Sequence, residues 1–273
     1  MLKLGSIALG TVLLFSGMIT FSQQNTENKE EIYYQDTEEI SYVNTEVGSG
    51  TTASMTINYS NRNSTIHSLA LTYPTYCYSP AIGSCAAIAG GNVIGFFDRY
   101  DENLIPNHSS GRPIANTYMY SSEDSAVHAV ICELYEYMGT TMSGTTEKQF
   151  KDGMTAFCAA KGRSITFSSC MQGGSLNYST AKNYLDANQP IILFLSSYNV
   201  INMVEKNNQD SLSIYVSDTP HIMISFGYKS YIYDGTTTYN YFSVASGIIG
   251  QSNGLYNINY KTKINNALAV NIS

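Results

Sequence analysis

The chain has 273 residues, of which 43% are hydrophobic, so it is long enough to bury a sizeable core in one or two domains. Its 14 basic and 21 acidic residues give a formal net charge of −7, and no basic patch is visible, which argues against nucleic-acid binding. The 23 tyrosines, the absence of tryptophan and the many Ser, Thr and Asn residues favour an extracellular protein that contains β-sheet.

The first 22 residues (1–22) are typical of a secretory signal peptide. Lys3 supplies a short basic start, an apolar run extends from Leu4 to Phe21, and Ser22 belongs to a small-residue cleavage site. A membrane anchor is the alternative, but small polar residues interrupt the run, and its length barely suffices to span a bilayer. No second apolar stretch of that length follows. We therefore expect a secreted or cell-surface protein that has no membrane partner after signal removal.

Residues 23–66 are predicted to form an acidic polar tail or propeptide. They hold seven acidic and two basic residues and are rich in Asn, Thr and Ser, so they are too polar to build a core by themselves. A short strand at Ala53–Tyr59 is able to dock onto the globular part. The pattern leaves open whether this segment is a linker, a propeptide or an N-terminal extension.

The globular part is expected to span residues 67–273, with helices first and strands second. Helical spacing of apolar residues dominates the first half, and short apolar or alternating runs bounded by turn residues dominate the second half. This order predicts an α+β domain in which helices pack on an antiparallel sheet. The expected helices are Cys85–Tyr100, Asp124–Met138, one that begins at the capping box Thr146–Gln149 and continues through Cys158, and Ser179–Asp186. The expected strands are Ile191–Leu195, His221–Tyr228, Tyr231–Tyr233, Tyr239–Val244, Asn257–Tyr260 and Ala267–Asn271.

Five cysteines lie in this globular part: Cys77, Cys85, Cys132, Cys158 and Cys170. An odd number in a secreted protein leaves at least one thiol unpaired. The simplest interpretation keeps Cys85 free. The other four then form two disulfides or remain as buried thiols.

Cys85 is the candidate nucleophile and His221 the candidate base. Cys85 follows the turn Gly83-Ser84 and begins a helix, where unpaired backbone N–H groups and the helix dipole favour the thiolate. His221 opens an apolar strand 136 residues later, and a separation of roughly 130–150 residues is typical of papain-like peptidases. The thiolate attacks a carbonyl, the imidazolium protonates the leaving group, and the backbone N–H of Cys85 stabilises the oxyanion. The alternatives are a cysteine that only packs in its helix and a half-buried sheet histidine.

Several blocks of the sequence resemble papain-like cysteine peptidases, in the bacterial branch similar to the bacteriocin-processing, double-glycine peptidases. The resemblance spans roughly residues 73–260 and implies a papain-like fold, in which a helical part that carries the Cys packs on a sheet that carries the His. It also implies a secreted cysteine peptidase that hydrolyses peptide bonds of a peptide or protein substrate and needs no metal or other cofactor. The blocks are Gly83–Tyr100, Asn183–Leu193 and His221–Tyr228, and Tyr241–Gly247 is similar to streptopain-type peptidases.

Two positions depart from the family pattern. The family places a glutamine six residues before the Cys, and this chain has Ser79 there. The family's Asn or Asp that orients the His is expected near Val244–Gly247, where Ser246 is the nearest polar residue and Asn240 the nearest amide in sequence. Asn240 is the candidate third catalytic residue, because an amide oxygen is a good acceptor for the second ring nitrogen. The departures leave two other functions open: a catalytically degenerate fold that acts as a secreted or surface binding protein, and a thiol hydrolase of cell-wall peptides.

Overall fold

The computed structural model describes residues 41–42, 50–69, 73–101, 103–108, 125–248, 251–258 and 264–273, which all belong to one compact unit, Glu38–Ser273. The expected signal peptide, residues 1–22, lies outside the described residues, as do residues 23–40 of the expected tail. Within the described ranges, no helix combines the length and the apolar character that a membrane span requires.

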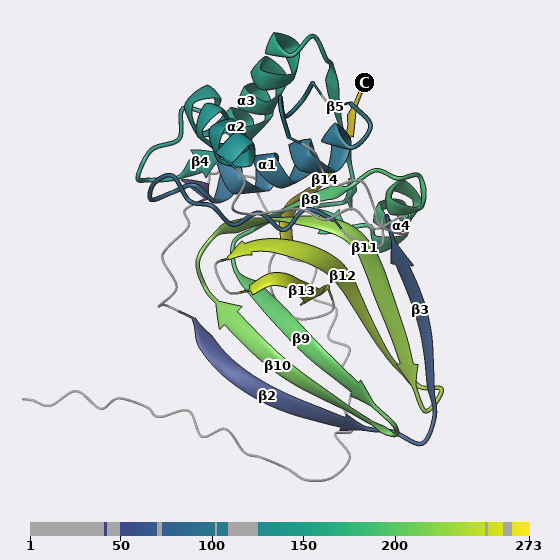
Figure 1. Ribbon diagram of the computed structural model, residues 1–273. Helices are drawn as coiled ribbons and strands as arrows, with labels where there is room; N and C mark the ends of the chain where they lie inside the picture. Colours follow the sequence, from purple (N-terminus) through teal and green to yellow (C-terminus); the bar gives the residue numbers. More distant parts are fainter. Residues whose placement is uncertain are drawn as a thin grey trace, which may run out of the picture. The chain divides into compact units, whose positions relative to one another are not determined.

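The described residues form four helices and a large antiparallel sheet (Figure 1), so the fold mixes helices with an antiparallel sheet. The helices are α1 (Cys85–Asp98), α2 (Ser125–Tyr137), α3 (Glu147–Ala160) and α4 (Tyr178–Asp186). The strands are β1 (Ser41–Tyr42), β2 (Thr51–Asn58), β3 (Arg62–Ser68), β4 (Thr145–Thr146), β5 (Ile165–Ser169), β6 (Met171–Gln172), β7 (Ser175–Leu176), β8 (Ile191–Leu195), β9 (Tyr198–Lys206), β10 (Gln209–Ser217), β11 (His221–Tyr233), β12 (Thr237–Ile248), β13 (Gln251–Asn257) and β14 (Ile264–Ile272).

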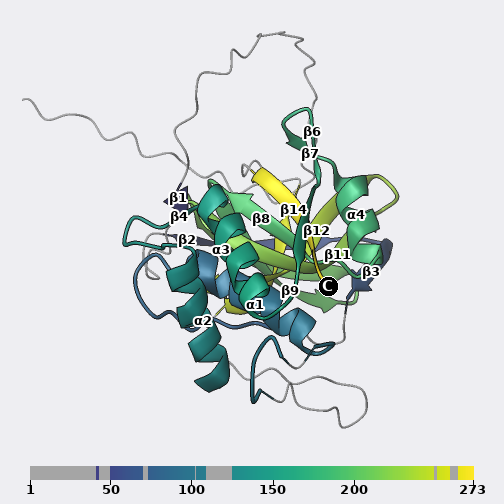
Figure 2. The same cartoon turned by 90° about the horizontal axis from the view of Figure 1, so that it is seen from above.

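The large sheet has the strand order β2-β10-β9-β13-β12-β11-β8-β14-β5, and β3 pairs in addition with β11. Two short ladders, β1 with β4 and β6 with β7, lie outside it. Helices α1, α2 and α3 form one group in both views (Figures 1 and 2), and α1 contacts β11 and β12 of the sheet. The sheet and this helix group therefore meet where α1 and β11 lie against each other.

Strand β11 connects the two halves of the large sheet. Residues 221–225 pair with β8, residues 227–233 pair with β3 on the same edge, and β12 follows the opposite edge. The register with β12 shifts between Ser225 and Gly227, which is a β-bulge. A side chain at Gly227 would collide with the main-chain oxygen of His67, so glycine is what lets β3 approach here. His221 begins the half of β11 that pairs with β8.

Helix α1 is buried along its whole length. Its glycines allow neighbours to come close: a Cβ at Gly95 would lie 2.5 Å from the Tyr76 ring, and one at Gly90 would lie 2.9 Å from the sulfur of Met154. Contacts of this kind account for glycines in a helix interior, where each costs about 1 kcal/mol of helix propensity relative to alanine. Close packing on several sides thus fixes α1, and with it the position of Cys85 at its start.

The N-terminal segment differs from the expected tail. Strand β2 pairs with β10 along Thr51–Asn58, and β3 pairs with β11, so the expected boundary between residues 66 and 67 falls inside a strand of the sheet. β2 is the docked strand that the sequence allowed at Ala53–Tyr59. The sequence analysis did not predict β3, because an edge strand is held by main-chain hydrogen bonds and does not need apolar side chains on both faces. Most side chains of β2 are exposed, in agreement with its polar composition.

The described residues contain no disulfide. All five cysteines are thiols; Cys85, Cys158 and Cys170 are buried, and Cys77 and Cys132 are half-buried. Of the two alternatives that the sequence left open, the structure therefore has thiols rather than cross-links.

An ionic cluster around the buried Asp210, here called the Arg62 cluster, fastens β3 to β9 and β10. Nη1 of Arg62 lies 2.7 Å from each carboxylate oxygen of Asp210, and Nη2 lies 2.9 Å from Glu205. The Tyr233 hydroxyl donates to Asp210 at 2.7 Å, and the Tyr231 hydroxyl donates to Glu205 at 2.6 Å. The Asp210 side chain is fully buried. A buried carboxylate is tolerated only with such partners, so Arg62 holds the N-terminal strands in the folded unit.

Replacing Arg62 with alanine is expected to lower the free energy of unfolding by about 3–5 kcal/mol, because the Asp210 carboxylate then stays buried without its cationic partner. Urea-induced unfolding followed by circular dichroism measures the change. Lys148→Ala is the matched control, since its ion pair with Asp152 is exposed and is worth about 0–1 kcal/mol. Equal destabilisation by the two substitutions would contradict the role given to Arg62.

Candidate active site

Cys85 occupies the first position of α1, and the turn before it leaves the helix start open. Ser84 is the N-cap residue, but its side chain makes no capping hydrogen bond to the helix. Its hydroxyl donates instead to the main-chain oxygen of Ala81, and accepts from the Ala81 N–H at 3.2 Å. The first N–H groups of α1 are therefore available to the Cys85 sulfur, and those of Cys85 and Ala86 do interact with it.

Gly83 sets the direction in which the chain enters α1. Its φ of 87° lies in the left-handed region that favours glycine. A side chain at this position would also collide with the main-chain oxygen of Thr141 and would lie 3.3 Å from the nitrogen of Gly144. The turn at residues 141–144 thus packs directly against the turn that precedes Cys85, and only glycine satisfies both constraints.

His221 is the first residue of β11, opposite Leu195 of β8. Its Nε2 atom lies 2.6 Å from the main-chain oxygen of Ser246. A carbonyl oxygen only accepts, so Nε2 carries the hydrogen and donates it, and Nδ1 carries the lone pair. This hydrogen bond fixes both the tautomer and the orientation of a ring that is able to accept a proton at Nδ1.

An irregularity in β12 places the Ser246 carbonyl beside His221. The ladder with β11 ends at Ala245, and the ladder with β13 shifts register between Ala245 and Ile248. Gly247 adopts a φ of 68°, and the Ser246 hydroxyl accepts a hydrogen bond from the Ile248 N–H at 3.2 Å. Because Ser246 lies outside both ladders, its main-chain oxygen is directed at the imidazole rather than at a neighbouring strand.

Cys85 and His221 are brought together by the contact between α1 and β11. The main-chain N–H of Ile222, the residue that follows His221, donates to the Cys85 sulfur. The structure therefore places the sulfur of Cys85 beside the residue that follows His221, although Cys85 and His221 are 136 residues apart in the chain.

Burial controls the charge of this pair. Both side chains belong to residues that are only 1% exposed. Burial raises the pKa of Cys85 to about 12, against the opposite effect of the N–H groups of Ile222, Ala86 and Cys85. Burial lowers the pKa of His221 to about 4, against the opposite effect of the Ser246 carbonyl. In this form the pair is a neutral thiol and a neutral imidazole at pH 7, whereas the sequence predicts a thiolate.

The structure corrects the prediction that Asn240 orients His221. Asn240 lies opposite Ser230 in the β11–β12 ladder, and its side-chain oxygen accepts from the Ser230 hydroxyl at 2.7 Å. Ser230 is nine residues beyond His221 along β11, a separation of about 30 Å in an extended strand. Asn240 therefore cannot reach the imidazole, and the Ser246 main-chain oxygen takes that place.

Ser79, which stands where the family has its oxyanion glutamine, makes a local contact. It is exposed, and its hydroxyl donates to the main-chain oxygen of Ala81 at 3.0 Å. The donors that remain for an oxyanion are main-chain N–H groups at the start of α1.

The sequence analysis did not identify two groups that contact His221. The Ser246 main-chain oxygen has no side-chain signature, and the glycine that follows it is the one sequence signal for the turned backbone. Tyr198, whose ring centroid lies 4.8 Å from that of His221, belongs to a strand that the sequence did not predict. The one sequence signal for this acceptor was that Ser246 lies near the position where the resembling family has the Asn or Asp that orients the His.

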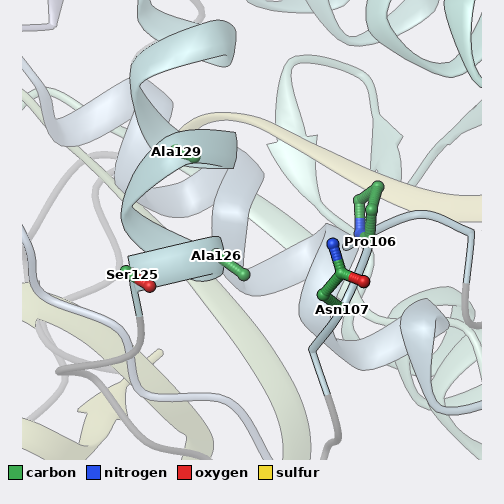
Figure 3. A pocket seen from close by; sticks show the side chains of 5 residues that line it. All are labelled: Pro106, Asn107, Ser125, Ala126 and Ala129. Carbon is green, nitrogen blue, oxygen red and sulfur yellow. The ribbon is translucent and has the colours of Figure 1, made fainter.

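Other places in the described residues offer less chemistry. Figure 3 shows a hollow beside the start of α2, which is lined by Pro106, Asn107, Ser125, Ala126 and Ala129. This lining has no titratable side chain and no cysteine. No group of three or more His, Cys, Asp or Glu side chains among the described residues is arranged to hold a metal ion.

Stability should depend on pH through His221. Its pKa is lowered from 6.5 to about 4 on folding, so the unfolded chain binds more protons in that interval and stability falls as the pH decreases through it. Lowering the pH from 7 to 4 should cost the wild type on the order of 3 kcal/mol more than His221→Gln. Urea unfolding of both proteins at the two pH values measures this difference. The same pH dependence in both would mean that His221 is not a buried neutral imidazole.

No protein-family model, no curated protein and no solved structure matches this chain. The function is therefore inferred from the geometry of Cys85, His221 and the Ser246 main-chain oxygen.

Proposed function

We propose that this chain is a secreted cysteine peptidase with a papain-like arrangement, which hydrolyses peptide bonds through Cys85 and His221. One observation carries the proposal: Nε2 of His221 donates to a fixed acceptor while the thiol at the start of α1 lies beside the next residue of the same strand. A nucleophile at a helix start, a base with a set tautomer and an acceptor behind that base are the components that thiol catalysis requires.

The chemistry follows from the tautomer of His221. Nδ1 accepts the thiol proton of Cys85, and the thiolate attacks the substrate carbonyl carbon, so a C–S bond forms and the carbonyl electron pair moves to oxygen. Main-chain N–H groups at the start of α1 stabilise that oxyanion. When the oxyanion collapses, the C–N bond breaks and the departing nitrogen takes the proton from Nδ1. Water then gives its proton to Nδ1 and hydrolyses the thioester, which releases the acid and restores the thiol.

The described form is a resting form of such an enzyme. A substrate carbonyl has to reach Cys85, which is 1% exposed, and the ion pair has to form where burial favours the neutral pair. Admission of water or of a polar substrate lowers the cost of charging both groups. Catalysis by this chain therefore includes an opening step before the chemical step.

A binding protein without catalysis is the second candidate, and the burial of the pair favours it. In that case the thiol and the imidazole are packing groups, as their neutral states at pH 7 allow. A thiol hydrolase of cell-wall peptides shares the mechanism of the first candidate and differs from it in substrate only.

The test compares the rates at which iodoacetamide modifies Cys85 in the full chain and in His221→Gln at pH 6 and at pH 9, read by mass spectrometry of the Cys85 peptide. Burial keeps a Cys85 thiol without a base largely protonated at both pH values, and its small thiolate fraction grows about tenfold with each pH unit. If His221 takes the thiol proton, the wild type should react at least about tenfold faster than His221→Gln at pH 6, and this ratio should be smaller at pH 9. A ratio removes the effect of restricted access, which both proteins share.

Controls and substrates separate the three functions. Asn240→Ala should react like the wild type, because Asn240 does not contact His221. Hydrolysis of a fluorescently labelled, unfolded protein by the wild type but not by Cys85→Ala supports the peptidase. Equal rates in the wild type and His221→Gln at both pH values overturn catalysis and leave the binding protein. If Cys85 reactivity depends on His221 and the chain cleaves isolated cell-wall peptides but not the unfolded protein, the third function is identified.

A further inference from the structure

A tyrosine from another strand packs on the imidazole of His221. Tyr198 is the first residue of β9 and is 5% exposed. Its ring centroid lies 4.8 Å from that of His221, and the two ring planes are inclined by 36°. One side of the imidazole is therefore in contact with an aromatic ring, in addition to the hydrogen bond that Nε2 makes with Ser246.

The hydroxyl of Tyr198 is anchored to the turn that precedes His221. Tyr198 lies opposite Ser217 in the β9–β10 ladder, and its hydroxyl hydrogen-bonds to the side chains of Ser217 and Thr219. The hydroxyls of Ser217 and Thr219 are themselves 2.8 Å apart. The ring of Tyr215 lies behind Tyr198, with centroids 6.1 Å apart. Because Thr219 is two residues from His221, these bonds fix the tyrosine ring relative to the base.

The groups around the pair are otherwise uncharged. Tyr198 on β9 is the titratable group that packs against His221, and Tyr215 of β10 lies next to Tyr198. Cys85 on α1 lies beside the following residue, Ile222. From β12 the His221 ring receives only the main-chain oxygen of Ser246. Among the described residues, no carboxylate or ammonium group contributes to the pKa of His221 or of Cys85. An imidazolium formed here has few groups to stabilise it.

An aromatic ring is one such group. The face of a tyrosine ring attracts a cation, and the attraction is worth about 0.5–1 kcal/mol at exposed sites and about 2 kcal/mol or more where water is excluded. A neutral imidazole gains much less from the same contact. The contact therefore favours the charged state of His221 over the neutral one, and it does so without a carboxylate.

We propose that Tyr198 is a positioning residue of the active site, which holds the His221 ring and favours its protonated form when the Cys85 proton moves to Nδ1. This inference rests on the proposed function. Tyr198 takes part of the role that a side-chain orienter has in the resembling family, since Asn240 is remote and the acceptor here is a main-chain oxygen.

The experiment measures the iodoacetamide reaction of Cys85 from pH 5 to pH 9 in the full chain. Tyr198→Leu and Tyr198→Met remove the ring, and the methionine fills more of the space, so that one variant is available if the other fails to fold. Tyr198→Phe keeps the ring and loses the anchoring hydroxyl. Tyr239→Leu is the matched control, because it removes a partly buried tyrosine at the far end of β12, opposite Tyr231.

Loss of the ring should slow the reaction at pH 6 by up to about tenfold, because fewer Cys85–His221 pairs are then charged, and should slow it less at pH 9, where thiolate beside a neutral imidazole contributes more. Tyr198→Phe should show a smaller loss at pH 6, and Tyr239→Leu should keep the wild-type profile. A loss of rate by the same factor at every pH would overturn the proposal, because that is the effect of a structural role alone.

The result also separates this inference from the proposed function. A wild-type profile that depends on His221 but not on Tyr198 refutes the positioning role and leaves the peptidase in place. A wild-type profile identical to that of His221→Gln refutes both, since no imidazolium then exists for Tyr198 to favour.

Discussion

The complete burial of α1 is the constraint on which the rest of the molecule depends. A helix that exposes no face has to be enclosed by other elements, and glycines at Gly90 and Gly95 let side chains from Met154 and Tyr76 reach its backbone. The same closeness brings the start of α1 against the start of β11. The thiol of Cys85 then meets the N–H of Ile222 without any dedicated loop to carry it there.

Burial also works against the chemistry that it assembles. Excluding water raises the pKa of the Cys85 thiol and lowers that of the His221 imidazole, so the pair is neutral at pH 7. The opposing contributions are small and local: main-chain N–H groups at the sulfur, a main-chain oxygen at Nε2, and an aromatic ring beside the imidazole. The charge of the pair thus depends on the balance between burial, which favours the neutral forms, and these few local contacts, which favour the charged forms.

The sequence predicted the parts of the fold whose signal is local. The capping box at Thr146 and Gln149 is present at the start of α3, and the apolar run Ile191–Leu195 forms β8 with the predicted bounds. The positions of Cys85 at the start of a helix and of His221 at the start of an apolar strand were also predicted. These features depend on neighbours within a few residues, which a sequence displays directly.

The missed parts depend on distant partners. Strand β3 is polar and forms because β11 supplies hydrogen bonds, while β9 and β10 have a changing burial pattern that hides their alternation. In the sequence Arg62 has no feature that marks it as structural, because its partners Asp210 and Glu205 are more than 140 residues away. Asn240 was the wrong residue to orient His221. A search by residue type finds only side-chain acceptors, whereas the observed acceptor is a main-chain oxygen.

A backbone acceptor gives the site an unusual kind of mutational robustness. No single codon change at position 246 removes the oxygen that binds His221, because every amino acid carries the same carbonyl. The sensitive position is its neighbour Gly247, whose φ of 68° disfavours most replacements. The oxygen therefore survives any replacement of Ser246 that its buried position accepts, and Gly247, one position away from the atom that makes the contact, is the residue whose replacement would redirect it.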